Sequence, residues 1–477
     1  MLPPSILFLA YMVRYMLAHS LFIGKRSSTR SVYPPLGVFV LATLLVCVGS
    51  TAAADEWPQW RGPTREGVWK EAGLLESFPA ERIEDGRLKR RWRAEIGSGY
   101  NGPTVAGGRV FVMDRQTKPK QTERVLAFAA DSGNPLWTFE YDCTYEHISY
   151  EAGPRAAVSI ADGLAYALGT MGHLHCLSAA TGEVVWKKDL FNEYKIRMPG
   201  WGIAAAPLAD GDKLIVQVGG EKACLVAFDR RSGKELWRAL DDKASYSAPI
   251  IVSQAGKRVL VCWTGESISG LNPEDGSVYW QQPFKPERMV INIATPVVDG
   301  DRLFLTSFYD GSFMLKLRQD RPAAELLWAR HGPDERTTDA LHSIISTPYF
   351  AGDYVYGVDS YGELRCLDAA TGDRIWEDRT ATPKERWSNI HMVKNGERMW
   401  MFNEAGELVI GRLTPRNFEE ISRAKLIAPT RVQLNRREGV CWSHPAYAYK
   451  HVFARSDEEL VCVNLAEDAD APIPAPK

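Results

Sequence analysis

Aromatic and cationic side chains recur just before and within a set of short, similar strand-like segments along this sequence of 477 residues. An aromatic ring can stack on a flat group and an arginine or lysine can pair with negative charge, so together they could hold a planar anionic ligand. Each aromatic ring has an alternative interpretation as packing in a channel. Carboxylates are scarce nearby, with Glu151 and Glu438 the closest. The candidate binding residues are Arg155, Trp201, Lys243, Asn292, His342, Arg386, Asn389 and Trp442, with Tyr100, Tyr246, Trp387, His391 and His444 in comparable positions.

Other kinds of catalytic chemistry have no matching pattern in the sequence. It contains no G-x-S-x-G nucleophile motif, no phosphate-binding loop and no H-E-x-x-H metal motif. The cysteines include no C-x-x-C pair, so neither a zinc knuckle nor a covalently attached haem is predicted. Most cysteines lie in apolar runs such as HLHCL (173–177), where a small buried side chain is the favoured role and a disulfide the alternative. We therefore assign no catalytic residue and no metal ligand.

Composition and charge exclude several classes of protein. Apolar residues make up 45% of the chain and charged residues 24%, which is typical of a globular protein and not of a disordered chain or a coiled coil. Residues 1–54 contain four basic residues and no acidic one, so the rest of the chain has 53 basic and 59 acidic residues. A mildly acidic body does not favour binding to a nucleic acid backbone.

The first 54 residues have the pattern of an export signal. Lys25, Arg26 and Arg30 precede the apolar run Gly37–Gly49, and the small residues 52–54 follow it. The run is shorter than the roughly 20 residues that a membrane-spanning helix needs. We expect cleavage near Ala54 and a periplasmic or extracellular mature protein, with an uncleaved membrane anchor as the alternative.

An internal repeat organises the rest of the chain. Each copy has an apolar start, a polar turn and a tryptophan four residues after a glycine, a position that suits a turn with positive φ. A degenerate copy ends at Trp328, and Trp92 lies in a lone segment near the start. Successive tryptophans are 43 to 51 residues apart. The five clear copies are AFAADSGNPLW (127–137), CLSAATGEVVW (176–186), AFDRRSGKELW (227–237), GLNPEDGSVYW (270–280) and CLDAATGDRIW (366–376).

A second row of segments repeats with the same period and gives eight copies. Two residues before each aligned position the side chain is small in seven of the eight copies, as expected where strands converge on a crowded axis. A β-rich segment follows each of them, which makes about four short strands per repeat. We predict an all-β, eight-bladed β-propeller of four-stranded antiparallel blades. The aligned positions are Pro103, Val158, Pro207, Pro249, Pro296, Pro348, Met392 and Pro445.

The two ends of the repeat region are expected to meet. The last unit, Trp442–Leu465, has three strands, and the segment 88–97 with Trp92 could supply the fourth. The expected organisation is a leader (1–54), an N-terminal strap (55–87), the propeller (88–466) and an acidic, proline-rich tail (467–477). Trp92→Ala should then destabilise the protein far more than Trp69→Ala, because Trp69 belongs to the strap and to no repeat.

The motif A-x-D-x-x-[TS]-G-x-x-x-W resembles the repeat of the pyrroloquinoline-quinone (PQQ) β-propeller family, and WPQWRGPTREGV (57–68) resembles the strap of such secreted propellers. That family includes quinoprotein alcohol dehydrogenases and the non-catalytic propeller subunit of the outer-membrane β-barrel assembly machinery. A dehydrogenase of this kind implies a quinone on an aromatic floor, a calcium ion held by oxygen ligands and an aspartate base. Such dehydrogenases commonly carry a pair of adjacent cysteines, and this sequence has none.

The functional expectation is a non-catalytic scaffold that binds a protein partner through loops on one face or through its central funnel. No cofactor is expected in that case. The alternative is a PQQ- and calcium-dependent dehydrogenase that oxidises alcohols or sugars. A third hypothesis is that the protein is a module that binds a carbohydrate or a small anion in the funnel.

Overall fold

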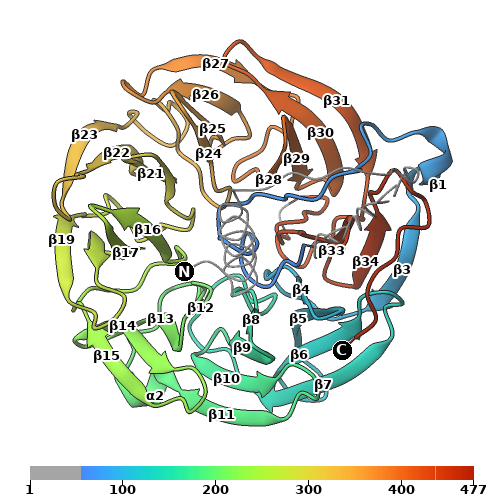
Figure 1. Cartoon of the computed structure of the whole chain (residues 1–477), viewed down its shortest axis with the longest axis horizontal. Coiled ribbons are helices and arrows are strands. Elements are labelled where there is room, and N and C mark those ends of the chain that lie inside the picture. Colours follow the sequence, from blue (N-terminus) through green and yellow to red (C-terminus); the bar gives the residue numbers. More distant parts are fainter. Residues whose placement is uncertain (1–54, 436, 477) are drawn as a thin grey trace, which may run out of the picture. The chain divides into compact units, whose positions relative to one another are not determined.

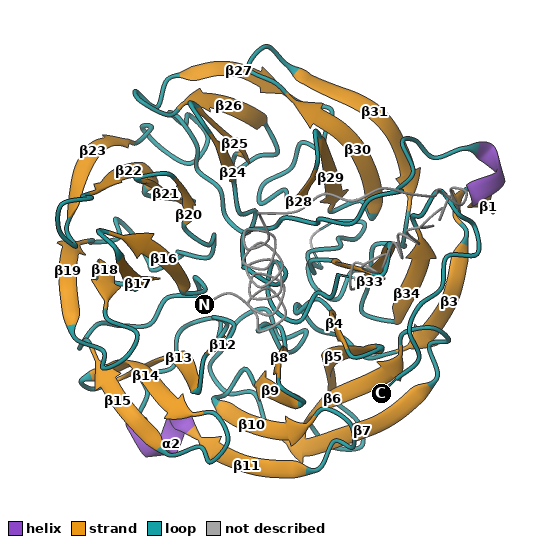
Figure 2. Cartoon of the chain, viewed as in Figure 1, coloured by secondary structure: helices purple, strands orange, loops and turns teal. Residues whose placement is uncertain are grey.

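The computed structural model describes residues 55–435 and 437–476, and within them eight four-stranded antiparallel sheets stand around a central axis (Figure 1). The predicted eight-bladed β-propeller is confirmed. The helical elements in this part of the chain are a 3-10 turn, η1 (Ala80–Arg82), and one short helix, α2 (Leu190–Tyr194), as Figure 2 shows. None of the helices in the described residues is long and apolar enough to cross a membrane. The predictions of an export signal and of cleavage near Ala54 concern residues 1–54, which lie outside the described residues.

Seven blades are built from consecutive strands that run from the axis outward. Blade one comprises β4 (Thr104–Ala106), β5 (Arg109–Gln116), β6 (Thr122–Ala129) and β7 (Pro135–Asp142), and blade two comprises β8 (Ser159–Ala161), β9 (Leu164–Leu168), β10 (His173–Ser178) and β11 (Val184–Asp189). Blade three comprises β12 (Leu208–Asp210), β13 (Lys213–Gly220), β14 (Ala223–Asp229) and β15 (Glu235–Ala239), and blade four comprises β16 (Ile250–Gln254), β17 (Lys257–Trp263), β18 (Ser267–Leu271) and β19 (Val278–Pro283). Blade five comprises β20 (Val297–Asp299), β21 (Arg302–Ser307), β22 (Gly311–Leu317) and β23 (Ala324–Arg330), and blade six comprises β24 (Tyr349–Ala351), β25 (Tyr354–Val358), β26 (Leu364–Asp368) and β27 (Arg374–Asp378). Blade seven comprises β28 (Ile390–Asn395), β29 (Arg398–Asn403), β30 (Glu407–Leu413) and β31 (Phe418–Lys425).

The eighth blade joins the two ends of the described chain. Its inner strands are β32 (Ala446–Ala448), β33 (His451–Arg455) and β34 (Glu459–Asn464), and its outer strand is β3 (Arg90–Glu95). In the register of β3 against β34, Trp92 lies opposite Cys462. Just before β3, a small hairpin pairs β1 (Ile83–Glu84) with β2 (Arg87–Leu88).

Burial within a blade follows the distance from the outer rim. A middle strand such as β14 is buried on both faces, because neighbouring blades pack against it from either side, whereas the outer strand β7 alternates between exposed and half-buried side chains. The seven cysteines of the described chain are free and buried, so the apolar role favoured by their sequence context is confirmed.

The repeated tryptophan packs on the next blade. Trp137 Nε1 donates a hydrogen bond of 3.2 Å to the carbonyl oxygen of Ala179 in the following blade, and its ring covers Gly182. That glycine has φ +75°, and a Cβ added to it would lie 2.7 Å from Trp137 Cδ2. Gly182 is therefore required both by its turn and by the indole above it. The same ring-on-glycine contact recurs in the pairs Trp92–Gly133, Trp186–Gly233, Trp237–Gly276 and Trp328–Gly372.

The strap crosses one end of the propeller axis. Trp57 exchanges backbone hydrogen bonds with Val105 of blade one, and the backbone N–H of Trp69 donates to Lys394 O of blade seven at 2.8 Å. The Trp69 ring lies 5.6 Å from the Trp400 ring and 5.1 Å from the Tyr447 ring. Trp69 is only 1% exposed and Trp92 is 8% exposed, so their burial does not support the expectation that Trp69→Ala is far milder than Trp92→Ala. A strap can bury apolar side chains that no repeat motif includes.

Trp92→Ala is expected to lower the free energy of unfolding by about 3–5 kcal/mol, the usual cost of deleting a buried tryptophan. Trp92 is 8% exposed and its Nε1 donates to Ala130 O at 2.8 Å, which ties the eighth blade to the first. Urea denaturation would measure the loss. The matched control is Leu136→Ala, an outer-strand side chain that is 42% exposed and should change stability by less than about 1 kcal/mol. Equal, small effects of the two substitutions would contradict a ring-closing role for Trp92.

Candidate functional site

A cavity of about 380 Å³ lies on the propeller axis. Its walls come mainly from two positions of the repeat, which recur in each blade. The residues three before the aligned positions of the inner strands form the first column, and the residues one before them form the second column. Seven of the eight side chains in the first column line it, as do six of the eight in the second. Those of the first column are Tyr100, Arg155, Ala204, Tyr246, Ile293, Ile345 and Trp442. Those of the second are Ala157, Ala206, Ala248, Thr295, His391 and His444.

Alternation along an extended backbone explains this selection. Successive side chains of a strand point to opposite sides, so residues two apart face the axis together and the residue between them faces a neighbouring blade. The intervening column, from Asn101 to Ser443, is at most 1% exposed. Its small side chains let eight strands converge while larger rings project into the cavity.

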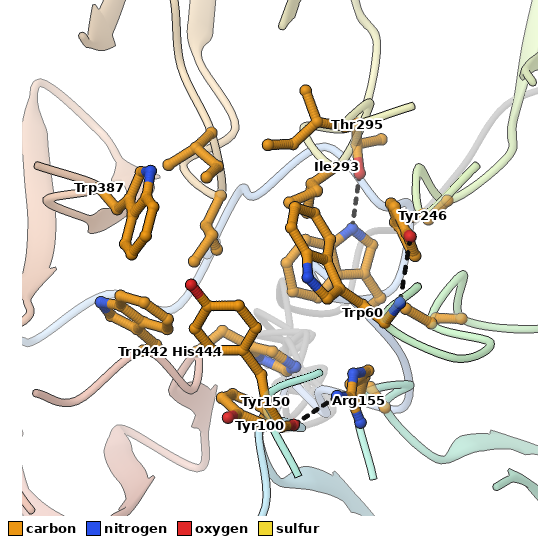
Figure 3. A pocket seen from close by; sticks show the side chains of 18 of the residues that line it. Trp60, Tyr100, Tyr150, Arg155, Tyr246, Ile293, Thr295, Trp387, Trp442 and His444 are labelled. Atoms are coloured by element: carbon orange, nitrogen blue, oxygen red, sulfur yellow. Dashed lines mark hydrogen bonds between the residues drawn. The ribbon is translucent and has the colours of Figure 1, made fainter. Parts of the chain in front are cut away.

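Aromatic rings gather at the open end of the cavity (Figure 3). The Tyr150 ring lies 6.0 Å from the Trp201 ring, 6.1 Å from the Trp387 ring and 6.3 Å from the Trp442 ring. Tyr150 and Trp387 adopt positive φ angles of 59° and 70°. Large side chains rarely take this backbone conformation, and such strain concentrates at functional sites.

The strap forms the closed end. Trp60 Nε1 donates a hydrogen bond of 2.8 Å to Thr295 Oγ1, and the Trp60 ring stands edge-on to the His444 ring at 4.6 Å. The strap motif was recognised in the sequence, but nothing in the sequence indicated where the strap lies in the fold. Trp60 was therefore missed as a lining residue. Tyr150, in the loop between β7 and β8, was missed as well, whereas Trp201, Trp387 and Trp442 were found.

Two buried histidines beside Trp60 remain neutral. Burial lowers the pKa of His444 to about 3 and that of His391 to about 4, and the nearby charge of Arg61 contributes in the same direction. His391 Nε2 lies 2.9 Å from Trp442 O, whereas His444 Nε2 is buried without a hydrogen-bond partner.

Two arginines contribute positive charge at the cavity wall. Arg65 of the strap is 4% exposed and donates to the carbonyl oxygens of Ala206, Pro207 and Pro249, so its guanidinium lies directly behind the cavity wall. Burial lowers the pKa of Arg65 to about 9, which still leaves it charged at neutral pH. Arg155 lines the cavity, and it too donates only to neutral groups, among them Gly153 O at 2.7 Å and Ser149 O at 2.9 Å. Within the described chain neither arginine forms an ion pair with a carboxylate.

Five of the predicted binding residues lie outside the cavity. Each of these five side chains forms an ion pair or a hydrogen bond within the protein instead. Lys243 is exposed and pairs with Glu266 at 3.1 Å, and Arg386 pairs with Glu335 at 3.1 Å. Asn292, His342 and Asn389 are fully buried, where they hydrogen-bond with Thr264 O at 2.8 Å, Phe308 O at 3.1 Å and Ser346 Oγ at 2.7 Å, respectively.

The cavity does not fit a quinone with its calcium ion. Calcium requires several oxygen ligands together, and no carboxylate lines the cavity in the part of the chain described here. A buried carboxylate outside the lining, Glu404, accepts a hydrogen bond from Trp442 Nε1 at 3.1 Å and is paired with Arg437. Among the described residues, no group of three or more His, Cys, Asp or Glu is placed to hold a metal ion.

Comparisons with known proteins agree with this architecture. The family described as outer membrane protein assembly factor BamB matches residues 121–378 and 334–471. BamB of Shewanella oneidensis is 24% identical over 245 residues, which cover 47% of this chain and 60% of that protein. The quinoprotein alcohol dehydrogenase PedH of Pseudomonas putida is 30% identical over 159 residues, 31% of this chain and 25% of the enzyme. The crystal structure of BamB from Moraxella catarrhalis superimposes with a TM-score of 0.55 at 15% identity, covering 78% of this chain and 98% of that one, a likeness of fold. The chain thus spans less than two thirds of the length of each of these two curated relatives.

The neutral His444 makes stability depend on pH. Its pKa is about 3 in the folded protein against 6.5 ordinarily, so the unfolded chain takes up a proton below about pH 6.5 that the folded protein refuses. The free energy of unfolding therefore falls as the pH decreases from 7 to 5. His444→Phe keeps an aromatic ring against Trp60 and should reduce this fall by about 2 kcal/mol.

Urea denaturation at pH 7 and pH 5 would measure the difference. Met392→Leu, a volume-conserving change at a buried neighbour of His391, is the control and should shift stability equally at both pH values. A His444→Phe protein with the same pH dependence as the parent would show that His444 is protonated in the folded state.

Proposed function

Because the chain belongs to the family described as outer membrane protein assembly factor BamB, we propose that it is a non-catalytic propeller that serves as a scaffold for another protein. Its partner binds at the face where the cavity opens. By analogy with the names of its relatives, the partner is a protein of outer-membrane assembly, and the chain acts after export to the periplasm. The leader pattern in residues 1–54 supports that location.

One observation supports the proposal: the open face offers apolar contact surface, and the described residues that line the cavity include no carboxylate. Loops that join the outer strand of one blade to the inner strand of the next surround the opening. Met289 on such a loop is 43% exposed, and Val432 on another is 54% exposed. Together with the aromatic rings of Trp201 and Trp387, which line the cavity, they give this face apolar surface on loops that a rigid framework positions.

The dehydrogenase alternative has support in the likeness to PedH. That likeness covers a quarter of the enzyme and is confined to about three blades of this chain. The lining of the cavity, with one arginine and no carboxylate among the described residues, provides neither the calcium ligands nor the base that quinone-dependent oxidation needs.

A photo-crosslinking amino acid at position 289 should give a discrete protein adduct in the cells that make this protein. Position 375 is the matched control, because Ile375 is 44% exposed but lies on the outer strand β27. Mass spectrometry should identify the adduct from position 289 as an outer-membrane protein or an assembly component, with no such adduct from position 375. Equal adducts at both positions, or none at 289, would contradict the proposed binding face.

A second arm distinguishes scaffold from enzyme. The purified protein should retain no pyrroloquinoline quinone after incubation with the quinone and calcium followed by desalting, and it should not reduce a dye with an alcohol as substrate. Stoichiometric retention together with dye reduction would overturn the scaffold in favour of a dehydrogenase.

A further inference from the structure

The axial cavity has the features of a small-molecule site. It is closed at one end by Trp60 and opens at the other between Tyr150, Trp201 and Trp387. A volume of about 380 Å³ lies within the range of small-molecule pockets, and such pockets combine apolar walls with a few polar groups. The walls here are aromatic rings, aliphatic chains and four alanines, with few polar atoms.

Two arginines at the cavity have no carboxylate partner among the described residues. Arg155 lies on the wall and Arg65 lies behind it, and every group that either guanidinium binds is neutral. A buried cation without a counter-ion is costly, and a bound anion would repay part of that cost. On the strap, Arg61 is also half-buried and adds to the positive potential that His391 and His444 experience.

We propose that the axial cavity binds a small aromatic carboxylate, a ligand with a flat apolar body and one negative charge. The rings of Tyr150, Trp201 and Trp442 enclose the flat body, and the carboxylate lies toward Arg155 and the wall that Arg65 supports. Neutral sugars do not fit as well, because they need several hydrogen-bonding partners that this lining lacks. The cavity opens at the protein-binding face proposed above, and Met289 belongs to both. Titration of the purified protein and crosslinking in cells are separate measurements, so either proposal can fail without the other.

Calorimetric titration of the purified protein with three probes of one shape tests the charge and the ring together. The probes are 1-naphthoate, the neutral 1-naphthylmethanol and the cationic 1-naphthylmethylammonium. We expect 1-naphthoate to bind with one site per chain, at least about tenfold more tightly than the alcohol, since a charge-assisted contact is worth more than 1.4 kcal/mol. The ammonium probe should give no measurable binding.

Variants locate the site. Ala204→Phe fills the cavity from a half-exposed wall position and should abolish binding of 1-naphthoate. Arg155→Gln and Arg65→Gln should each weaken it about tenfold, because glutamine can still donate to carbonyl oxygens but carries no charge. The matched control is Arg416→Gln, which removes an exposed arginine in the turn between β30 and β31 and should leave the affinity unchanged.

Thermal unfolding of each variant separates lost binding from lost folding, and Ala204→Phe and Arg155→Gln keep the test decisive if Arg65→Gln does not fold. Tighter binding of the alcohol or the ammonium probe than of 1-naphthoate would overturn the charge argument. Unchanged binding of 1-naphthoate to the folded Ala204→Phe protein would place its site elsewhere and overturn the proposal.

Discussion

The contact between an indole ring and a glycine of the next blade determines how this ring is assembled. At five of the eight junctions between blades, a tryptophan of one outer strand covers a turn glycine of the following blade so closely that a Cβ would collide with the ring. At six junctions the indole N–H also donates to a backbone carbonyl oxygen there, for example Trp376 Nε1 to Thr414 O at 2.9 Å. The contact sets both the spacing and the angle between neighbours, so repeating it around an axis closes the ring. Because this contact lies at the rim, the side chains on the axis are not needed to hold the blades together.

The character of the axis follows from that arrangement. Eight inner strands converge there, and the pleat of each strand divides its side chains between the crowded junctions and the central space. The strap then closes one end with Trp60 and brings the buried charge of Arg65 behind the wall. A rigid ring with an open, largely apolar hollow beside two arginines is suited to binding. Among the residues that the structure describes, the lining of this hollow includes no carboxylate.

The sequence predicted the ring well because its determinants are local and repeated. Tryptophan, glycine and the small residues near the aligned prolines recur with one period, and the number of copies gives the number of blades. The site was predicted in part. Tyr100 and Trp442 were found because they directly precede the inner strands, but Asn292, one residue out of phase with them, donates to Thr264 O of the preceding blade. The strap residue Trp60 could not be predicted, since its place depends on long-range contacts that no periodicity encodes.

The coupling between Trp137 and Gly182 tests the central claim, that the indole-on-glycine contact holds the blades together, most directly. Gly163 provides the control: its φ is +76°, close to the +75° of Gly182, but nothing lies within 4 Å of its added Cβ. Gly163→Ala should cost only the backbone strain, about 1–2 kcal/mol. Gly182→Ala should cost about 1–3 kcal/mol more by urea denaturation, and this excess should disappear in a Trp137→Leu background. An excess that is absent, or that persists unchanged without the indole, would contradict the account.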